Sequence, residues 1–260
     1  MRRKLLYGKR IGILAVLLVL FMAVGHAEEE RIDAGGRWRY VLEDGGATIM
    51  KHLVYPRGVV VIPGELDGFT VTGIGENAFL LDENLTHVTI PESVTSIGSG
   101  AFSGCSSLTS ITIPDGVTSI GDFAFFECAR LTETTIPASV IRIGLNPFAR
   151  CAHKNIRVAS ANPVYADTKG VLFDKIQKAL IAYPVGRSGK YVIPKGTLRI
   201  GESAFEWSAG LTGVTIPGSV TEIGEGAFNS FGAITLHVVK GSFAEQYAEE
   251  NRIPYVFATK

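Results

Sequence analysis

The chain has 260 residues, of which 46% are hydrophobic, and its 25 basic residues balance its 25 acidic ones. Five basic residues and no acidic ones lie within residues 1–27, so the remainder has 20 Lys and Arg against 25 Asp and Glu, a net charge near −5. This charge disfavours a nucleic-acid partner, because such proteins usually carry a clustered basic surface.

Residues 1–27 have the pattern of a signal peptide. Basic residues from Arg2 to Arg10 precede a 14-residue apolar stretch, and Gly25 and Ala27 place small residues where signal peptidase cleaves. The stretch is shorter than the roughly 20 residues of a membrane-spanning helix. We expect cleavage after Ala27, no stable membrane insertion afterwards, and a secreted, periplasmic or cell-surface protein. An uncleaved anchor is the alternative.

Residues 28–73 are predicted to form an N-terminal cap. The runs 38–42 and 48–53 flank Asp44-Gly45-Gly46, which indicates a β-hairpin closed by a glycine turn. Such a hairpin would cover the first edge of the molecule. A loose first copy of the repeat described next ends at Pro63.

The central region, residues 74–239, is an internal repeat with a period of 23 residues. The copies share an Ile-Gly pair, an Ala-Phe pair and, in most of them, an Ile-Pro pair, with Pro147 in place of alanine before Phe148. The recurring phenylalanines are Phe79, Phe102, Phe125, Phe148, Phe205 and Phe228. A fixed period in the twenties indicates one supersecondary unit per repeat, with each unit stacked on its neighbours in a solenoid.

Two strands are expected in each copy. The spacing Leu-x-x-Ile-x-Ile-Pro, as in residues 108–114, places alternate apolar residues on one face of a strand. The β-branched run 117–120 indicates a second strand on another side of the coil. For the short Ala-Phe corner we expect a 3₁₀ or brief α segment. The predicted fold class is therefore α/β: a leucine-rich repeat solenoid, rich in β structure, with short helical turns and caps at both ends.

The period breaks once, between Pro137 and Pro194, where 57 residues replace the expected 46. Asn162-Pro163 predicts a turn, and the apolar runs 170–174 and 179–184 around a polar connection predict a hairpin within about 160–184. His153 takes the leucine position of the preceding copy, where strand register is hardest to predict. We interpret it as a packing residue.

Residues 240–260 are predicted to form a C-terminal cap. Ser242 and Glu245 have capping-box spacing and open a helix that extends to about Glu250, with Phe243 and Tyr247 on one face. Residues 253–257 are predicted to form a closing strand. A repeat array needs such terminal units to cover its last apolar rows.

The repeat as a whole resembles the BspA-like leucine-rich repeats over roughly residues 36–257. The resemblance rests on the recurring Ile-Pro, Val-x-x-Ile-Gly, Ala-Phe and Cys positions, and it extends to the inserted hairpin. It implies a curved, β-rich solenoid at the cell surface or outside the cell, binding proteins or surfaces, often without catalytic activity.

Cys105, Cys128 and Cys151 each follow a core phenylalanine by three residues. They therefore occupy one row, with strands about 4.8 Å apart, where parallel side chains keep their Cβ atoms farther apart than a disulfide prefers. Buried free thiols are the favoured interpretation. One disulfide or a metal site is the alternative, although an odd count argues against an obligatory disulfide framework.

No catalytic motif stands out in the sequence. The five histidines show no paired-ligand spacing, and phosphate-loop, nucleophile-elbow and His-Glu-x-x-His motifs are missing. We therefore expect no catalytic, cofactor-binding or metal-binding residues.

The leading hypothesis is an exported, monomeric interaction protein that binds a protein or surface glycan in an adhesion-type role. A structural envelope scaffold and an envelope hydrolase are the alternatives. The candidate binding residues are the outward positions of the leucine-containing strands: Thr86, His87, Thr89, Thr109, Ser110, Thr112, Thr132, Glu133, Thr135, Thr212 and Thr215. The same residues would also suit a plain solvated β surface.

Overall fold

The computed structural model describes residues 29–54, 58–229 and 234–258. The predicted signal peptide and its cleavage position lie outside the described residues. In chain order the elements are β1 (Arg31–Ile32), β2 (Trp38–Glu43), β3 (Gly46–His52), β4 (Gly58–Val61), β5 (Glu65–Leu66), β6 (Phe69–Ile74), β7 (Leu85–Thr89), β8 (Ser96–Ile97), β9 (Ser110–Ile111), β10 (Ser119–Ile120), β11 (Glu133–Ile136), β12 (Arg142–Ile143), β13 (Asn155–Val158), β14 (Tyr165–Thr168), β15 (Val171–Asp174), β16 (Ala179–Ala182), β17 (Gly189–Val192), β18 (Arg199–Ile200), β19 (Leu211–Thr215), β20 (Glu222–Ile223), β21 (Thr235–Val238), α2 (Phe243–Glu250) and β22 (Tyr255–Phe257).

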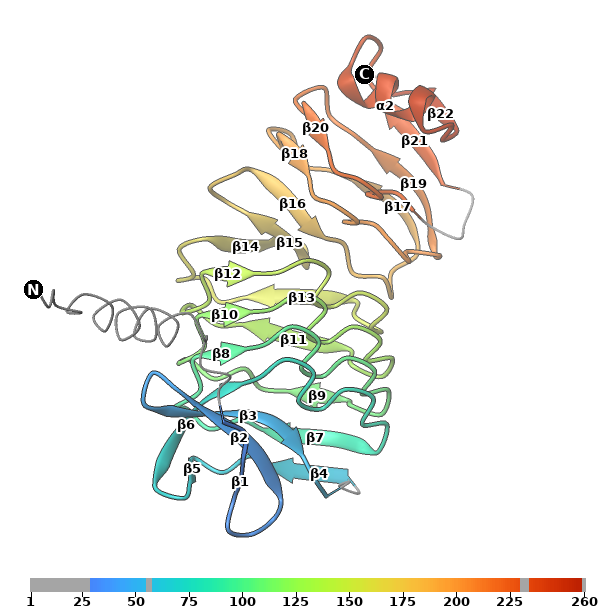
Figure 1. The fold of residues 1–260 in the computed structure, drawn as a ribbon. Helices are drawn as coiled ribbons and strands as arrows, with labels where there is room; N and C mark the ends of the chain where they lie inside the picture. The colour runs from blue at the N-terminus through green and yellow to red at the C-terminus, as the bar shows by residue number, and fades with distance from the viewer. Residues whose placement is uncertain (1–28, 55–57, 230–233, 259–260) are drawn as a thin grey trace, which may run out of the picture.

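The coils stack in chain order into a β-solenoid (Figure 1). Each repeat contributes one strand to the leucine side, such as β7 and β9, and one to the Ile-Gly side, such as β8 and β10. Equivalent residues pair in parallel, so Ile120 faces Ile97 on one side and Ile143 on the other. The 23-residue period therefore becomes the register of the sheets, as the sequence predicts.

The core follows the same register. Phe79, Phe102, Phe125 and Phe148 stack nearly parallel, with successive ring centroids 4.9, 5.4 and 5.5 Å apart. Phe205 and Phe228 repeat this contact at 5.0 Å. Burying one aromatic ring per coil against its neighbours removes a continuous apolar row from water, which is the main favourable contribution to stacking.

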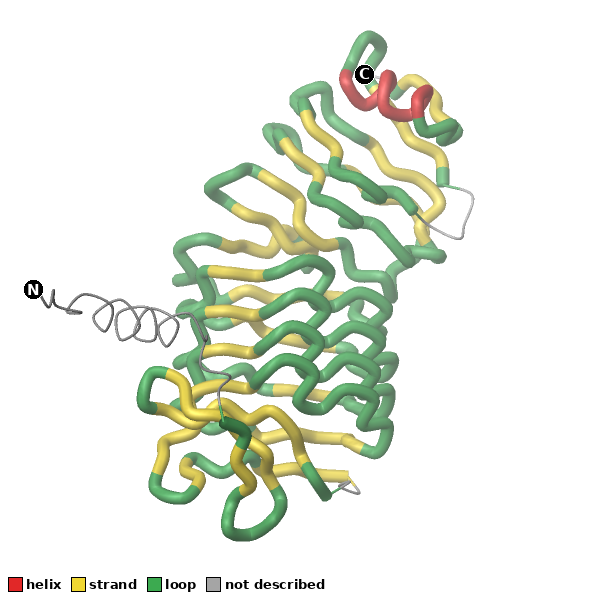
Figure 2. Tube along the Cα trace, in the orientation of Figure 1, coloured by secondary structure: helices red, strands yellow, loops and turns green. Residues whose placement is uncertain are grey.

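The Ala-Phe corners are not helical, so the prediction of short 3₁₀ or α segments there is wrong; α2 is the one helix assigned within the described ranges. The residues two before and two after each core phenylalanine, where described, have φ between 47° and 75°, in the left-handed region that interrupts a helix. The amide N–H of Phe102 bonds the carbonyl of Ala124 in the next coil at 2.7 Å, and Phe79 does the same with Ala101 at 2.8 Å. These corners therefore form turns that are hydrogen-bonded between coils (Figure 2).

The inserted region forms a three-stranded antiparallel meander, β14-β15-β16, which joins the repeats again through parallel pairing of β16 with β18. The predicted hairpin corresponds to β15 and β16, while β14 was not expected. Asn162 forms the predicted turn. Its side-chain amide donates to the carbonyls of Pro137 and Val140, and its oxygen accepts the N–H groups of Val164 and Tyr165.

The insertion also divides the molecule. On the leucine side β13 pairs with β11 and β17 pairs with β19, but β13 and β17 do not pair with each other. The buried residues form two clusters, one that runs from Trp38 to Leu172 and one that begins at Val171. We call this junction between β13 and β17 the seam.

At the N-terminal end, β2 and β3 form the predicted hairpin, with positive φ at Asp44 and Gly45 in its turn. At the other end, Ser242 is the N-cap of α2, as the capping signal predicts. The buried face of α2 consists of Ala244 and Ala248, whereas Phe243 is 41% exposed. In the portion of the chain that the structure describes, no helix has the length and apolar character needed to cross a membrane.

Candidate functional site

The predicted binding residues lie on strands β7, β9, β11 and β19 or directly beside them. None of the eleven is buried, because each alternates with an inward aliphatic residue or a core threonine along its strand. We call these eleven residues the outward strand face. The strands that carry them follow one another from coil to coil along the leucine side (Figure 1), with His87 opposite Ser110 in the register of β7 and β9.

Three members of this face contact one another. Thr109 Oγ1 donates to the Thr86 carbonyl at 3.2 Å and lies 3.3 Å from Nε2 of His87. His87 Nδ1 lies 3.1 Å from Thr86 Oγ1. The imidazole is therefore held between two strands by hydroxyl groups, which restricts its rotamers before any partner arrives.

The face is not one continuous sheet. Glu133 lies on β11, which pairs with β13, and the seam then separates this sheet from β17 and β19. Thr212 and Thr215 are on β19 and so lie across the seam from the other nine residues. The sequence pattern, which repeats the same residues on both sides, suggests a single surface and does not indicate this division.

The structure adds apolar groups that the sequence analysis did not select. Val59 and Val61 on β4 are 62% and 66% exposed, and they pair with His87 and Thr89 of β7. Val192 on β17 is 65% exposed and pairs with Thr215. The alternation within residues 58–62 of the loose first copy could have identified Val59 and Val61 from the sequence. Exposed valines beside polar groups supply the apolar contact that a surface of threonines lacks.

His153 is a buried packing residue, as predicted. It is 1% exposed and its Nε2 lies 2.9 Å from Oγ1 of Thr134, which is 2% exposed. Burial lowers the pKa of His153 to about 4, so the ring is neutral near pH 7. Thr134 occupies an aliphatic position of its copy and His153 the leucine position of the next, so two polar substitutions in adjacent coils pair through Nε2, while the buried Nδ1 of His153 has no hydrogen-bond partner in the described part of the chain.

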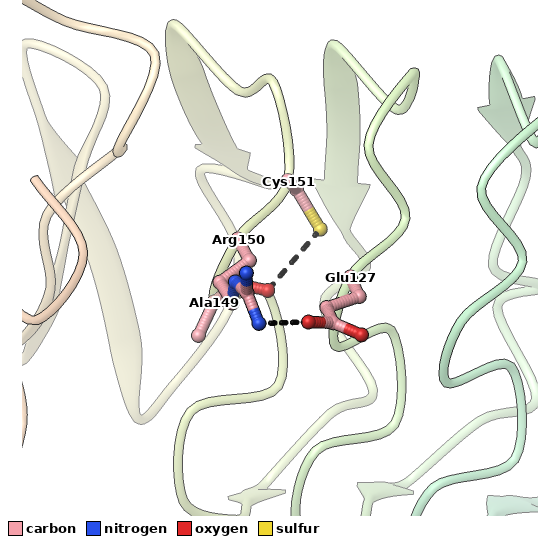
Figure 3. Close-up of polar contacts among 4 residues, drawn as sticks. All are labelled: Glu127, Ala149, Arg150 and Cys151. Atoms are coloured by element: carbon pink, nitrogen blue, oxygen red, sulfur yellow. Dashed lines mark hydrogen bonds and ion pairs between the residues drawn. The ribbon is translucent and has the colours of Figure 1, made fainter.

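The three cysteines are free and buried in one row. Each thiol donates to the carbonyl of the core phenylalanine in the preceding coil, at 3.2, 3.2 and 3.0 Å in chain order. Burial raises the pKa of the Cys105 thiol. Figure 3 shows the Cys151 thiol directed at the Ala149 carbonyl, while the neighbouring Arg150 pairs with Glu127 of the preceding coil. Within the described ranges, no three His, Cys, Asp or Glu side chains converge as a metal site would require.

Comparison with protein families matches residues 69–165 and 187–247 to the BspA type leucine rich repeat region, in six copies. The chain belongs to this family. It is similar in structure to a leucine rich cell surface protein from Faecalibacterium prausnitzii, with 27% identity, a TM-score of 0.51, and coverage of 82% of this chain and 76% of that one. A leucine-rich repeat protein from Eubacterium ventriosum shares 25% identity at a TM-score of 0.59, over 78% of this chain and 64% of that one.

The pneumococcal vaccine antigen PcpA shares the fold at 21% identity and a TM-score of 0.54, over 77% of this chain and 67% of that one. A search of curated proteins found no match. The BspA-type repeats support a role in protein interaction, and the neighbour from Faecalibacterium prausnitzii is described as a cell surface protein.

The segment between the two matched ranges contains most of the insertion. There the β15-β16 hairpin overhangs the outer side of β8, β10 and β12 and forms an open groove of about 700 Å³. Ile141 and Ile176, which are 50% and 71% exposed, line it together with Ser96, Ser119 and Arg142. This hairpin groove is a second candidate surface, on the opposite side from the outward strand face.

Proposed function

We propose that this BspA-type repeat protein is an exported, non-enzymatic adhesion-type protein that binds a protein partner through the outward strand face. The observation that supports this most is the pairing of exposed Val59 and Val61 with His87 and Thr89. It places apolar and polar groups side by side on a rigid sheet, and interfaces combine such groups. A surface glycan partner, or an accessory scaffold role without a specific ligand, remains the alternative.

Rigidity also favours this surface. The strands of the leucine side are fixed by inter-coil hydrogen bonds, and His87 is already held by Thr86 and Thr109. A partner would therefore meet a surface that loses little side-chain entropy on binding.

The test uses partner capture. The purified protein is exposed to solubilised surface proteins, and any captured partner is then purified and its Kd measured. The double variant His87→Ala/Glu133→Ala should weaken binding, while each change alters the free energy of unfolding by no more than about 0.5 kcal/mol, as is usual for exposed positions. The control variant Glu92→Ala/Thr118→Ala removes one acidic and one hydrogen-bonding polar side chain elsewhere and should leave Kd unchanged.

If the His87/Glu133 variant binds as tightly as the parent while Ile141→Ser/Ile176→Ser abolishes binding, the hairpin groove is the binding site. The outward strand face would then be only its support. A partner that binds the parent and all three variants equally would contradict both surfaces.

We also propose that the two terminal segments act as caps. The β2-β3 hairpin pairs through β3 with β6, and α2 packs beside the last coil, where the Tyr247 and Phe228 rings are 6.1 Å apart. Covering the end rows keeps their apolar side chains and open strand edges from recruiting further chains. A capped chain of this kind would be a monomer.

A further inference from the structure

The seam contains a cavity whose chemistry differs from the rest of the surface. It is open, has a volume of about 470 Å³ and is lined by Lys154, Asn155, Tyr183, Arg187, Lys190 and Tyr191, with no acidic residue among its lining groups. Its size falls in the range of small-ligand pockets, about 300–1,000 Å³. In a chain whose remainder after residue 27 carries more acidic than basic residues, three cations around one cavity form a local positive site.

Arg187 is held in place at this site. Its Nε donates to the Lys154 carbonyl at 2.6 Å, and its Nη2 donates to Asn155 Oδ1 at 2.6 Å and to the Lys169 carbonyl. Nη1 has no partner in the described part of the chain, and neither Lys154 nor Lys190 forms an ion pair there. A fixed guanidinium with a free amino group is preorganised to receive an anionic oxygen.

Neutral polar groups accompany the charges. The Tyr191 hydroxyl is shielded from solvent and has no hydrogen-bond partner. An unpaired buried hydroxyl is unfavourable unless a shift of its ring opens it to a ligand or to water. The Asn155 amide nitrogen and Ser188, which also lines the cavity, add further hydrogen-bonding groups. An acidic peptide would need only the cations, whereas a sugar acid offers both an anionic group and the hydroxyls that these groups can bind.

We propose that the seam cavity binds one unit of an anionic glycan, with the carboxylate or sulfate group at Arg187, Lys154 and Lys190 and the sugar hydroxyls at Asn155, Ser188 and Tyr191. The site exists because the insertion separates β13 from β17 and Arg187 bridges the two segments. It uses none of the eleven residues of the outward strand face. The proposal therefore does not depend on the proposed protein partner, and either can fail without the other.

The test is calorimetric titration of the purified protein with four probes: a uronic acid tetrasaccharide, a sulfated tetrasaccharide, a neutral tetrasaccharide of equal length and a tetraglutamate peptide. At least one anionic sugar should bind at least about tenfold more tightly than the neutral one, since a single charge-assisted hydrogen bond is worth about that much. The comparison between the two acidic sugars distinguishes carboxylate from sulfate recognition.

Lys154→Glu/Lys190→Glu should weaken binding of that sugar by more than about tenfold, because it reverses two charges of the site. Lys51→Glu/Lys195→Glu makes the same total charge change at exposed lysines elsewhere and should alter Kd by less than about twofold. Tyr191→Phe removes one hydroxyl and keeps the ring, and it should cost several-fold in affinity while thermal unfolding shows the fold intact.

Four outcomes would overturn the proposal. They are no binding of either acidic sugar, equal binding of the neutral sugar, equal losses in the Lys51/Lys195 control, and tetraglutamate binding that matches the sugars with the same dependence on Lys154 and Lys190. The last result would reassign the cavity to an acidic segment of a protein partner.

Discussion

At the scale of single residues, the interior is a set of rows in which each side chain contacts its equivalents one coil away. Phe125 is fully buried between Phe102 and Phe148, and the cysteines and aliphatic residues of each copy form parallel rows around this stack. Because neighbours in a row share shape as well as polarity, a change at one position affects two interfaces at once.

The phenylalanine row provides the most direct test of packing. We expect Phe125→Ala to lower the free energy of unfolding by about 3–5 kcal/mol, the range for emptying a core aromatic site. Phe123→Ala is a matched control, because Phe123 is 40% exposed and points out of the same corner. Its cost should be at most about 1 kcal/mol in chemical denaturation. Equal losses of stability in the two variants would show that the phenylalanine row does not stabilise the core.

The buried pair of Thr134 and His153 predicts a pH dependence of stability. The pKa of His153 is about 4 in the folded chain, below its ordinary value of 6.5, because burial disfavours the imidazolium. Between these values the unfolded chain binds a proton that the folded chain does not. The stabilisation present above about pH 6.5 is therefore lost as pH falls towards 4, by about 3 kcal/mol in total.

Denaturation of the parent and of Thr134→Val/His153→Leu at pH 7 and pH 4.5 measures this contribution. The double variant should lose that part of the pH dependence. Near neutral pH it should be at least as stable as the parent, since both partners become apolar together. His87→Ala, which removes an exposed histidine, should retain the dependence of the parent. An unchanged slope in the double variant would show that His153 titrates normally.

The cysteine row predicts three unreactive thiols. Cys105 and Cys128 are fully buried and Cys151 is 3% exposed, so reagents cannot reach them, and the raised pKa of Cys105 removes its thiolate near neutral pH. A thiol reagent should therefore titrate close to none in the folded protein and three after unfolding without reductant. Recovery of only one thiol in the unfolded chain would instead reveal a disulfide.

At the scale of elements, the insertion joins the following repeats by pairing β16 with β18, whereas on the leucine side β13 and β17 are connected by side-chain contacts in place of sheet pairing. Asn162 links β14 to the preceding coil, Arg187 links β17 to β13, and the Arg150 guanidinium lies 4.5 Å from the Trp207 ring across the seam. On the leucine side, these side chains connect the two segments that backbone pairing would connect in a regular repeat. Loss of one of them should have a larger effect on stability than loss of an exposed polar residue within a regular coil.

Asn162→Ala tests this role. Asn162 is 1% exposed and makes four hydrogen bonds to backbone groups, so its removal leaves buried carbonyl and N–H groups unpaired. We expect a loss of about 2–4 kcal/mol in the free energy of unfolding. Asn84→Ala, at an exposed position, should cost less than about 0.5 kcal/mol. Similar small losses for both variants would mean that the insertion is held by its strands alone.

At the scale of the whole molecule, a rigid stack with an N-terminal signal pattern predicts an exported protein. We expect N-terminal sequencing of exported material to begin at Glu28, because Gly25 and Ala27 provide the small residues that signal peptidase selects. Ala27→Arg should block this cleavage, and Glu30→Arg should not. Recovery of intact Met1 in the membrane fraction would instead identify residues 1–27 as an anchor.

The sequence by itself determined the period, the solenoid, the buried phenylalanine and cysteine rows, the inserted hairpin and the helix that begins after Ser242. These features depend on local patterns or on contacts between equivalent residues of adjacent copies, so the repeat register specifies them. The exposure of the eleven candidate residues follows from the same alternation along each strand.

Only the tertiary structure decided the features that cross the register. The corners are turns because their N–H groups bond the next coil, which no single copy reveals. Val59 and Val61 join the outward strand face only after β4 pairs with β7. The seam and its cavity arise where the insertion prevents β13 and β17 from pairing, so residues such as Arg150 and Trp207 meet outside the 23-residue spacing. Their contacts depend on how two differently packed clusters meet, and that geometry leaves no periodic signal in the sequence.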